Sequence, residues 1–310
     1  MSAYRCCRWG VDAPERSIAY HRDMVYLVLL SEPGRTYAVP KYRAGPGPLH
    51  AKPLASSLSR LVYHYRPGEV RRALEMVIAE REPCLGGPLS PLPSDSLVCS
   101  PSCRREELLL APRDALEVDA ASLIAEAEAL GARVHPTGSL LAYHHDPRIS
   151  DIDLVAYMDE APCHEAIDAL ETLLGHPPRA VLEEWARRRG VTPSTSRRWL
   201  QGWWRGRRVS TSYAYRLRQP CELAILGAGG PARLRLRLEP GGCRALAWPH
   251  VGFARDTLIV SFDGIYAPIL YEGGVVEVQG LRVKAVYRGE EWDAVLIGVA
   301  EAETWLRPTL

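Results

Sequence analysis

The sequence contains no run of 18 or so apolar residues, which is the length that a membrane-spanning helix needs. Its first residues, MSAYRCCRWGVDAPERS, also lack the apolar core of a signal peptide. We therefore expect a protein that has no membrane segment and acts in the cytoplasm.

Cysteine is present, but not in the pattern of a zinc site. The eight cysteines lie at positions 6, 7, 84, 99, 103, 163, 221 and 243, and they form no pair of CxxC motifs. A structural zinc site is therefore not expected. We expect most of these residues to be free, buried thiols, and the alternative for two of them is a bridge between Cys99 and Cys103.

The length of 310 residues and a hydrophobic fraction of 47% favour two or three domains with sizeable cores. The patterns predict an α+β chain in four parts: a small N-terminal β-rich region (1–82), a Pro/Gly/Ser-rich linker or loop (83–103), a mixed sheet with helices (104–228) and a C-terminal all-β barrel or sandwich (229–310). Residues 231–310 change character because RLRLRL alternates strictly and further strand-like runs follow between glycine-rich turns.

Several elements can be placed within these parts. A hairpin or small sheet is expected where VYLVLL and TYAVPKY flank the turn 32–35. Helices are expected over 67–81, 114–130, 140–145, 162–174 and 180–189, and a strand over 132–135. Asp114 is the expected N-cap of the second of these helices.

The segment TGSLLAYHHDPRISDIDLVAY, residues 137–157, carries the strongest functional signal. Asp151 and Asp153 would share one face of a strand, because alternate side chains point the same way. Two carboxylates on one face suit Mg²⁺, which completes its coordination with water and phosphate oxygens. Backbone amides after Gly138 and Ser139 could hold the phosphate. The alternative is an ordinary edge strand with two solvated aspartates.

A Gly-Ser pair followed by Asp-x-Asp and apolar residues resembles the signature of the DNA polymerase beta-like nucleotidyltransferase superfamily, here Gly138, Ser139, Asp151 and Asp153. The chain layout also looks similar to an archaeal group of predicted nucleotidyltransferases. The resemblance implies a nucleotidyltransferase-type sheet, a Gly-Ser pair that contacts the triphosphate of an NTP, and aspartates that bind Mg²⁺. It also implies a third carboxylate on a later strand.

The third carboxylate has no clear candidate nearby, because the strand-like segment 207–217 contains no acid. Glu222 is the nearest residue that could complete the catalytic group with Asp151 and Asp153. If Glu222 faces elsewhere, the alternatives are a substrate-assisted or single-metal transferase, or a degenerate domain that binds nucleotides without turnover. His144 and His145 could reach a phosphate or a metal, although a solvated helix face is the more common place for such residues.

Lysine occurs only at positions 41, 52 and 284, so arginine carries most of the positive charge. The segment 187–237 contains many arginines and a single acid, Glu222, with aromatic residues interleaved. Guanidinium groups beside aromatic rings are typical of surfaces that bind unpaired RNA. The predicted nucleic-acid contacts are Arg197, Arg198, Trp203, Trp204, Arg205, Arg207 and Arg208. The alternatives are a packed core with a solvated arginine face, or arginines neutralised by acids elsewhere in the fold.

Two smaller patterns accompany this segment. Residues 186–200 resemble a helix-turn-helix, with Thr192 as a helix N-cap and Pro193 in the first turn, which indicates geometry more than DNA reading. RLRLRL would place three arginines on one side of a strand, either as a face for single strands or as part of a packing or oligomerisation module.

These patterns together predict a Mg²⁺-dependent nucleotidyltransferase that moves a nucleoside monophosphate from an NTP to a hydroxyl acceptor and releases pyrophosphate. RNA is the acceptor that the arginine-rich segment favours. The alternative is a catalytically degenerate module that binds nucleotides or nucleic acid.

Overall fold

The protein is a mixed α+β chain with several sheets. The computed structural model describes residues 5–10, 12–63, 67–181, 183, 197, 199–227 and 229–309. Two compact units result, and each is discontinuous in sequence: the first comprises Met1–Val62 and Pro91–Leu217, and the second comprises Tyr63–Ser90 and Arg218–Leu310. The chain therefore leaves the first unit and returns to it.

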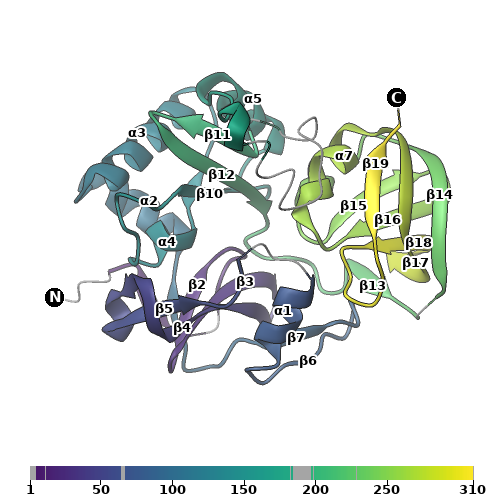
Figure 1. Ribbon diagram of the computed structural model, residues 1–310, viewed down its shortest axis with the longest axis horizontal. Helices are drawn as coiled ribbons and strands as arrows, with labels where there is room; N and C mark the ends of the chain where they lie inside the picture. The colour runs from purple at the N-terminus through teal and green to yellow at the C-terminus, as the bar shows by residue number, and fades with distance from the viewer. Residues whose placement is uncertain are drawn as a thin grey trace. The chain divides into compact units, whose positions relative to one another are not determined.

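The first unit contains an antiparallel sheet built from the N-terminal strands (Figure 1). Its hairpin follows from two hydrophobic runs that flank a turn, in which Gly34 takes a positive φ of 73°. This confirms the predicted hairpin. The strands, in the order β1-β8-β2-β3-β4 with β5 on β4, are β1 (Cys7–Trp9), β2 (Ile18–His21), β3 (Met24–Glu32), β4 (Arg35–Ala51), β5 (Ser56–Arg60) and β8 (Leu97–Cys99), with the 3₁₀ turn η1 (Lys52–Leu54) between β4 and β5.

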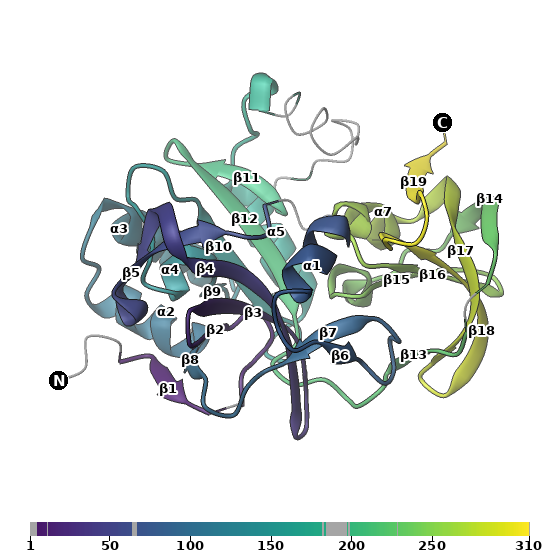
Figure 2. The same ribbon diagram turned by 60° about the horizontal axis from the view of Figure 1, so that its bottom comes forward.

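A second sheet of the first unit has the order β11-β12-β10-β9, with β10 and β12 parallel. Its strands are β9 (His135–Pro136), β10 (Ile152–Tyr157), β11 (Gln201–Trp204) and β12 (Arg207–Ala214). The helices of this part are α2 (Pro101–Leu110), α3 (Ala115–Ala129), α4 (Gly138–Leu141) and α5 (Cys163–Leu173). Helices α2 and α3 lie side by side, and α2 contacts β9 (Figure 1, Figure 2).

Helix α3 forms as the sequence predicts. The Asp114 side chain accepts hydrogen bonds from the backbone N–H groups of Leu116 and Glu117, which have no partner inside the helix. Its apolar positions, including Leu123 and Ile124, are fully buried. Helix α5 also matches its prediction, whereas α4 is shorter than the expected 140–145 because Tyr143 takes a left-handed φ of 53°.

The N-terminal strands belong to the same unit as the predicted transferase core, so the boundary expected at residues 83–103 does not separate two compact units. The hydroxyl of Thr137 donates to the carbonyl of Arg16 at 2.6 Å, and that of Tyr157 to the carbonyl of Glu15 at 2.8 Å. Thr137 and Tyr157 are both buried, so these bonds connect the second sheet to the turn that precedes β2 within one core.

The predicted linker over 83–103 is wrong as a secondary-structure assignment. The segment contains β7 (Pro88–Pro91), β8 and the start of α2. Strands of three or four residues are too short to show a periodic pattern in the sequence, so the prediction missed them. The helix predicted over 67–81 ends early, as α1 (Pro67–Leu74), and Glu80–Arg81 forms β6 instead, paired with β7. The predicted helix over 180–189 lies almost entirely outside the described residues.

The second unit holds a seven-stranded sheet that confirms the predicted β-rich tail; its closure into a barrel or sandwich stays a prediction. The long strand β17 organises it by pairing with β13, β14, β18 and β19. Its elements are β13 (Leu223–Ile225), β14 (Pro231–Leu238), η3 (Cys243–Leu246), β15 (His250–Ala254), β16 (Thr257–Ser261), η4 (Gly264–Tyr266), α7 (Ala267–Glu272), β17 (Gly274–Tyr287), β18 (Glu290–Ile297) and β19 (Trp305–Pro308).

Disulfides join Cys6 to Cys103, Cys7 to Cys99 and Cys84 to Cys221. The expectation of free thiols is therefore wrong for these six residues, and Cys99 and Cys103 do not bond to each other. Spacing could not show this, because the first two partners are 97 and 92 residues apart in sequence. No helix in the described part of the chain is long and apolar enough to cross a membrane.

Candidate active site

Strands β9 and β10 bring the two halves of the Gly-Ser…Asp-x-Asp motif together. They pair antiparallel, with Pro136 opposite Leu154, and the N–H of Thr137 donates to the carbonyl of Asp153 at 2.8 Å. Gly138 then follows directly at the start of α4. The fold thus places residues 137 and 138 beside Asp153, as the sequence motif predicts.

Gly138 is in van der Waals contact with the Asp153 carboxylate. It has a φ of 59°, and a β-carbon built on it would lie 2.1 Å from Oδ2 of Asp153. Only glycine meets both conditions, because any other side chain would clash there and would be strained in the left-handed region. Ser139, next in α4, is buried with 8% of its surface exposed.

Asp151, which directly precedes β10, and Asp153 within it lie on one face, because Ile152 and Leu154 between and after them are buried. On the neighbouring strand, Ser210 stands opposite Asp153 and donates its hydroxyl to Oδ1 of that residue. The guanidinium of Arg208 lies 3.5 Å from Oδ2 of Asp151. Both carboxylates therefore have partners on β12, and both remain partly exposed.

Asp151 is partly removed from solvent and lies among charges of both signs. Burial raises the pKa of this carboxyl, and the nearby negative charge of Asp153 adds to the increase. Three cations, Arg208, Arg60 and Lys41, act in the opposite direction without cancelling it. Lys41 on β4 and Arg60 on β5 come from the N-terminal sheet, and neither was expected here from the sequence. An anion that enters beside Asp151 would meet three positive charges.

Glu222 pairs with arginines of the second unit. Glu222 precedes β13 in the second unit, where its carboxylate lies 3.2 Å from Nε of Arg244 and 2.8 Å from Nη2 of Arg288. Burial alone would raise its pKa, but the charges of these arginines outweigh burial and lower it. The suggested role of Glu222 as third carboxylate stays a prediction, because Glu222 and the aspartates belong to different compact units.

The predicted RNA-binding arginines have acidic partners inside the first unit. Arg207 lies 2.6 Å from Asp119, and Arg205 lies 3.3 Å from Glu126, both on α3. Trp203 and Trp204 on β11 stand opposite Arg208 and Arg207 and are half-buried. Neutralisation within the fold thus applies to Arg207 and Arg208, whereas the pair of Arg205 with Glu126 is exposed on both sides and neutralises little of its charge.

Residues 187–196 and Arg198 of that segment lie outside the described residues. The nucleic-acid contact of Arg198 and the helix-turn-helix over 186–200, of which only 197, 199 and 200 are described, therefore stay predictions. Arg197 is described and half-buried, and its carbonyl accepts the N–H groups of Leu200 and Gln201. RNA contact by Arg197, Trp203 and Trp204 also stays a prediction.

The two histidines do not lie on a solvated helix face. His144 is 2% exposed, and burial together with the charges of Lys41, His145 and Arg60 lowers its pKa to about 3, so its imidazole is neutral. Its ring packs edge-on against Tyr42, with the centroids 5.0 Å apart. His144 is therefore a core residue of the first unit.

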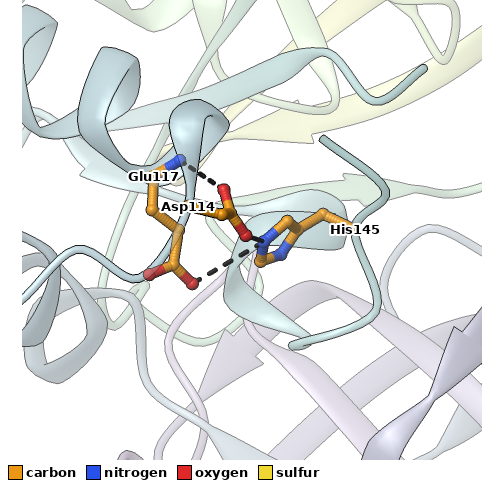
Figure 3. A group of neighbouring side chains, drawn as sticks. All are labelled: Asp114, Glu117 and His145. Carbon is orange, nitrogen blue, oxygen red and sulfur yellow. Dashed lines mark hydrogen bonds and ion pairs between the residues drawn. The ribbon is translucent and has the colours of Figure 1, made fainter. Parts of the chain in front are cut away.

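His145 forms a second cluster with Asp114 and Glu117 (Figure 3). Its Nε2 lies 2.8 Å from Oδ2 of Asp114 and 3.6 Å from Oε1 of Glu117. One ligand atom from each residue lies within 4.8 Å of the others, which is close enough to share a metal ion. The sequence predicts only a capping role for Asp114. The one sequence pattern that links Asp114 to Glu117 is their Asp-x-x-Glu spacing, which is typical of a capping box.

Cations of the chain already surround this cluster. The guanidinium of Arg104 contacts Oε1 of Glu117, and Arg104 itself is fully buried. The backbone N–H of Arg113 donates to Oε2 of Glu117 at 2.8 Å. A metal bound through the Glu117 carboxylate would have to displace one of these donors. We therefore interpret Asp114, Glu117 and His145 as part of a buried charge network.

No protein-family model matches the chain, and neither a curated protein nor a solved structure gives a significant match. Its function is therefore inferred from its own residues.

Proposed function

We propose that the protein is a Mg²⁺-dependent nucleotidyltransferase that moves a nucleoside monophosphate from an NTP to a hydroxyl acceptor and releases pyrophosphate. The observation that supports this most strongly is the contact between the Gly138 turn and the Asp153 carboxylate. It joins a backbone turn suited to phosphate with a carboxylate suited to a hard cation.

Asp151 and Asp153 fit Mg²⁺ by their chemistry. They are two hard oxygen donors on one strand face, and both are partly open to solvent, so water and phosphate oxygens could complete the coordination. The ion, when bound, would offset charge on the triphosphate. Ser210 would fix the Asp153 carboxylate through its hydrogen bond to Oδ1, which leaves Oδ2 on the side of Gly138.

Three cationic side chains support an anionic substrate at the same place. Arg208, Arg60 and Lys41 all lower the pKa of Asp151, so all three lie within electrostatic reach of it. In a partly desolvated site, such fixed charges stabilise the negative charge that builds on the leaving phosphate. We assign them to orientation of the triphosphate and to charge neutralisation.

The acceptor hydroxyl would attack the α-phosphorus, the bond to the β-phosphate oxygen would break, and pyrophosphate would leave. The strand next to β10 offers no acid to take the proton: β12 is fully described and carries Ser210 and Ser212 opposite Asp153 and Val155. The proton would pass to a phosphate oxygen of the substrate or to water. This is the substrate-assisted alternative named above.

The missing acid on β12 also favours a second candidate, a module that binds nucleotides without transferring them. The two candidates differ in one product. A transferase releases pyrophosphate in the presence of Mg²⁺ and an acceptor, whereas a binding module retains the NTP unchanged.

The test uses α-labelled NTPs with Mg²⁺ and the RNA, protein and small-molecule fractions of a cell extract. Wild-type protein should move label into one fraction, while Asp151→Asn and Asp153→Asn should not. Asp168→Asn is the matched control, because Asp168 is exposed on α5. Retention of NTP without pyrophosphate release would favour the binding module. Equal transfer by wild type and Asp153→Asn would rule out the proposed site.

A further inference from the structure

Strands β14, β17 and β19 of the second unit form a continuous three-stranded face. β14 pairs with the first half of β17, and β19 pairs with the same residues of β17 along its other edge, so β17 lies in the middle (Figure 1). Along β14 the arginines are exposed, whereas Leu234 and Leu236 turn inward and pack against the core of the unit. The arginines therefore lie on the outward face.

The register places side chains of the three strands in rows across this face. In one row, Gln279 of β17 stands between Arg233 of β14 and Trp305 of β19. In the next row, Glu277 stands between Arg235 and Arg307. Directly opposite residues of paired strands share a face and have neighbouring side chains. The rows thus gather guanidinium groups from two strands that are far apart in sequence.

A third row extends the face on the β14 side, where Arg237 stands opposite Val275. The face therefore carries four arginines, at 233, 235, 237 and 307. Glu277 is the only acid in these three strands, all of whose residues are described. Glu277 lies 3.4 Å from Arg233, in a pair exposed on both sides, so it neutralises little of the charge.

Trp305 gives this face a second property. The guanidinium of Arg307 lies 4.5 Å from its ring centroid, and that of Arg233 lies 5.3 Å from it. Planar guanidinium groups and an indole in contact make an amphipathic platform. Unpaired bases stack on such platforms while the arginines neutralise the phosphates. An acidic protein would use the charges but not the platform.

We propose that this face, defined by Arg233, Arg235, Arg237, Trp305 and Arg307, binds single-stranded nucleic acid. The spacing supports an extended strand: alternate arginines of β14 are about 6.8 Å apart, twice the rise per residue. The proposal does not rest on the transferase activity, since it concerns another unit and a binding event. It also differs from the arginine-tryptophan segment of the first unit, in which Arg205, Arg207 and Arg208 pair with acids.

The experiment measures binding of the full chain to fluorescently labelled oligonucleotides of about 12 nucleotides, a length within the usual site size. Single-stranded RNA, single-stranded DNA, a duplex, polyphosphate and polyglutamate are compared by fluorescence anisotropy over a range of salt concentrations. Wild-type protein should bind the single strands more tightly than the duplex or polyphosphate. A preference between RNA and DNA would identify which single strand is the ligand.

The variant Arg235→Gln/Arg237→Gln should lower the slope of log affinity against log salt by about 1.4, because each lost phosphate contact on a single strand removes about 0.7. The control Arg8→Gln/Arg255→Gln removes the same charge at two exposed positions, on β1 and in the turn between β15 and β16, and should leave the slope unchanged. Trp305→Leu should weaken single-strand binding by about tenfold and leave polyphosphate binding unaffected.

Three outcomes would overturn the proposal. The first is equal binding by wild type and Arg235→Gln/Arg237→Gln, and the second is an equal loss in the control variant. The third is binding of polyphosphate or polyglutamate as tight as that of the single strands, which would reveal a general polyanion or acidic-protein surface. Circular dichroism melting of each variant shows whether a loss of binding comes from unfolding. The arginine variants change exposed side chains and should keep the wild-type midpoint.

Discussion

A β-carbon at Gly138 would lie 2.1 Å from Oδ2 of Asp153, a separation that no pair of non-bonded carbon and oxygen atoms tolerates. The lack of a side chain at position 138 therefore allows the Asp153 carboxylate to stand over the first turn of α4. The proposed active site depends on this contact, so a substitution at Gly138 is the most direct test of the site.

The substitution Gly138→Ala should displace the Asp153 carboxylate and reduce nucleotidyl transfer by about 100-fold or more, since a shift of 1 Å in a reacting group has an effect of that size. The initial rate of label transfer is the measurement. Gly34→Ala is the matched control: Gly34 also has a positive φ, 73°, but has no atom within 4 Å of the added carbon. It should cost about 1–2 kcal/mol of stability and leave transfer intact. Wild-type transfer by Gly138→Ala would contradict the proposed role of the contact.

The charge network around Glu117 should contribute to stability. The substitution Glu117→Gln removes one of the two carboxylates that pair with Arg104, which is fully buried, and leaves Glu107 as its remaining charged partner. Removal of the sole partner from a buried pair typically costs about 3–5 kcal/mol of unfolding free energy, so this range is the upper bound for Glu117→Gln. Urea unfolding measures the change. Glu75→Gln is the control, because it breaks a solvent-exposed pair with Arg71 and should cost no more than about 1 kcal/mol.

The same network predicts the response to chelators. If Arg104, Arg113 and His145 neutralise the two carboxylates, EDTA should leave the melting temperature unchanged. A clear drop in the melting temperature with EDTA that persists in Asp151→Asn/Asp153→Asn but is lost in Glu117→Gln would instead identify Asp114, Glu117 and His145 as a metal site.

Stability should fall as the pH drops below about 6.5. Burial first, and the charges of Lys41, His145 and Arg60 after it, lower the pKa of His144 to about 3 in the folded protein, whereas an unfolded histidine takes up a proton near 6.5. Between these values the unfolded state binds one proton more, so the unfolding free energy decreases by up to about 1.4 kcal/mol per pH unit from this residue. Buried His135, whose pKa burial also lowers, acts in the same direction.

The substitution His144→Phe should flatten this pH dependence by one proton, whatever its effect on absolute stability. Urea unfolding at several pH values between 5 and 7 gives the slope. His164→Gln, at an exposed position on α5, should keep the wild-type slope. An unchanged slope in His144→Phe would show that His144 is protonated in the folded state.

The disulfides of β1 should stabilise the first unit. Cys7–Cys99 closes a loop of 92 residues, and a bond over a loop of that size typically contributes about 2–5 kcal/mol. Cys7→Ser/Cys99→Ser should therefore lower the melting temperature under non-reducing conditions. Addition of a reductant should lower the melting temperature of the wild type more than that of the variant, because the variant has already lost the Cys7–Cys99 bond. Equal midpoints with and without reductant would contradict these bonds.

Several features could be predicted from the sequence because they depend on residues close together in the chain. Asp114 caps α3 through N–H groups two and three residues away. The alternation of RLRLRL sets which side of β14 faces solvent. The Gly-Ser…Asp-x-Asp motif predicted that Gly138 and Asp153 lie close together, and they do, because β9, which leads into Gly138, pairs with β10.

The partners of the charged residues could not be predicted in the same way. Arginines 205, 207 and 208 looked like a surface for RNA, but acids of α3 and Asp151 pair with them. Glu222 is near β12 in sequence, yet it belongs to the other unit. Charge density along a chain does not reveal which opposite charges the fold will bring close.

The sequence by itself determined the hairpin, the capped helix α3, the alternating strand β14 and the local geometry of the aspartate pair, because backbone preferences and side-chain periodicity act over a few residues. Only the tertiary structure decided that Lys41 and Arg60 reach Asp151, that His145 meets Asp114 and Glu117, and that Cys7 bonds to Cys99. These pairs are separated by 28 residues or more, and their proximity depends on how whole sheets and helices pack.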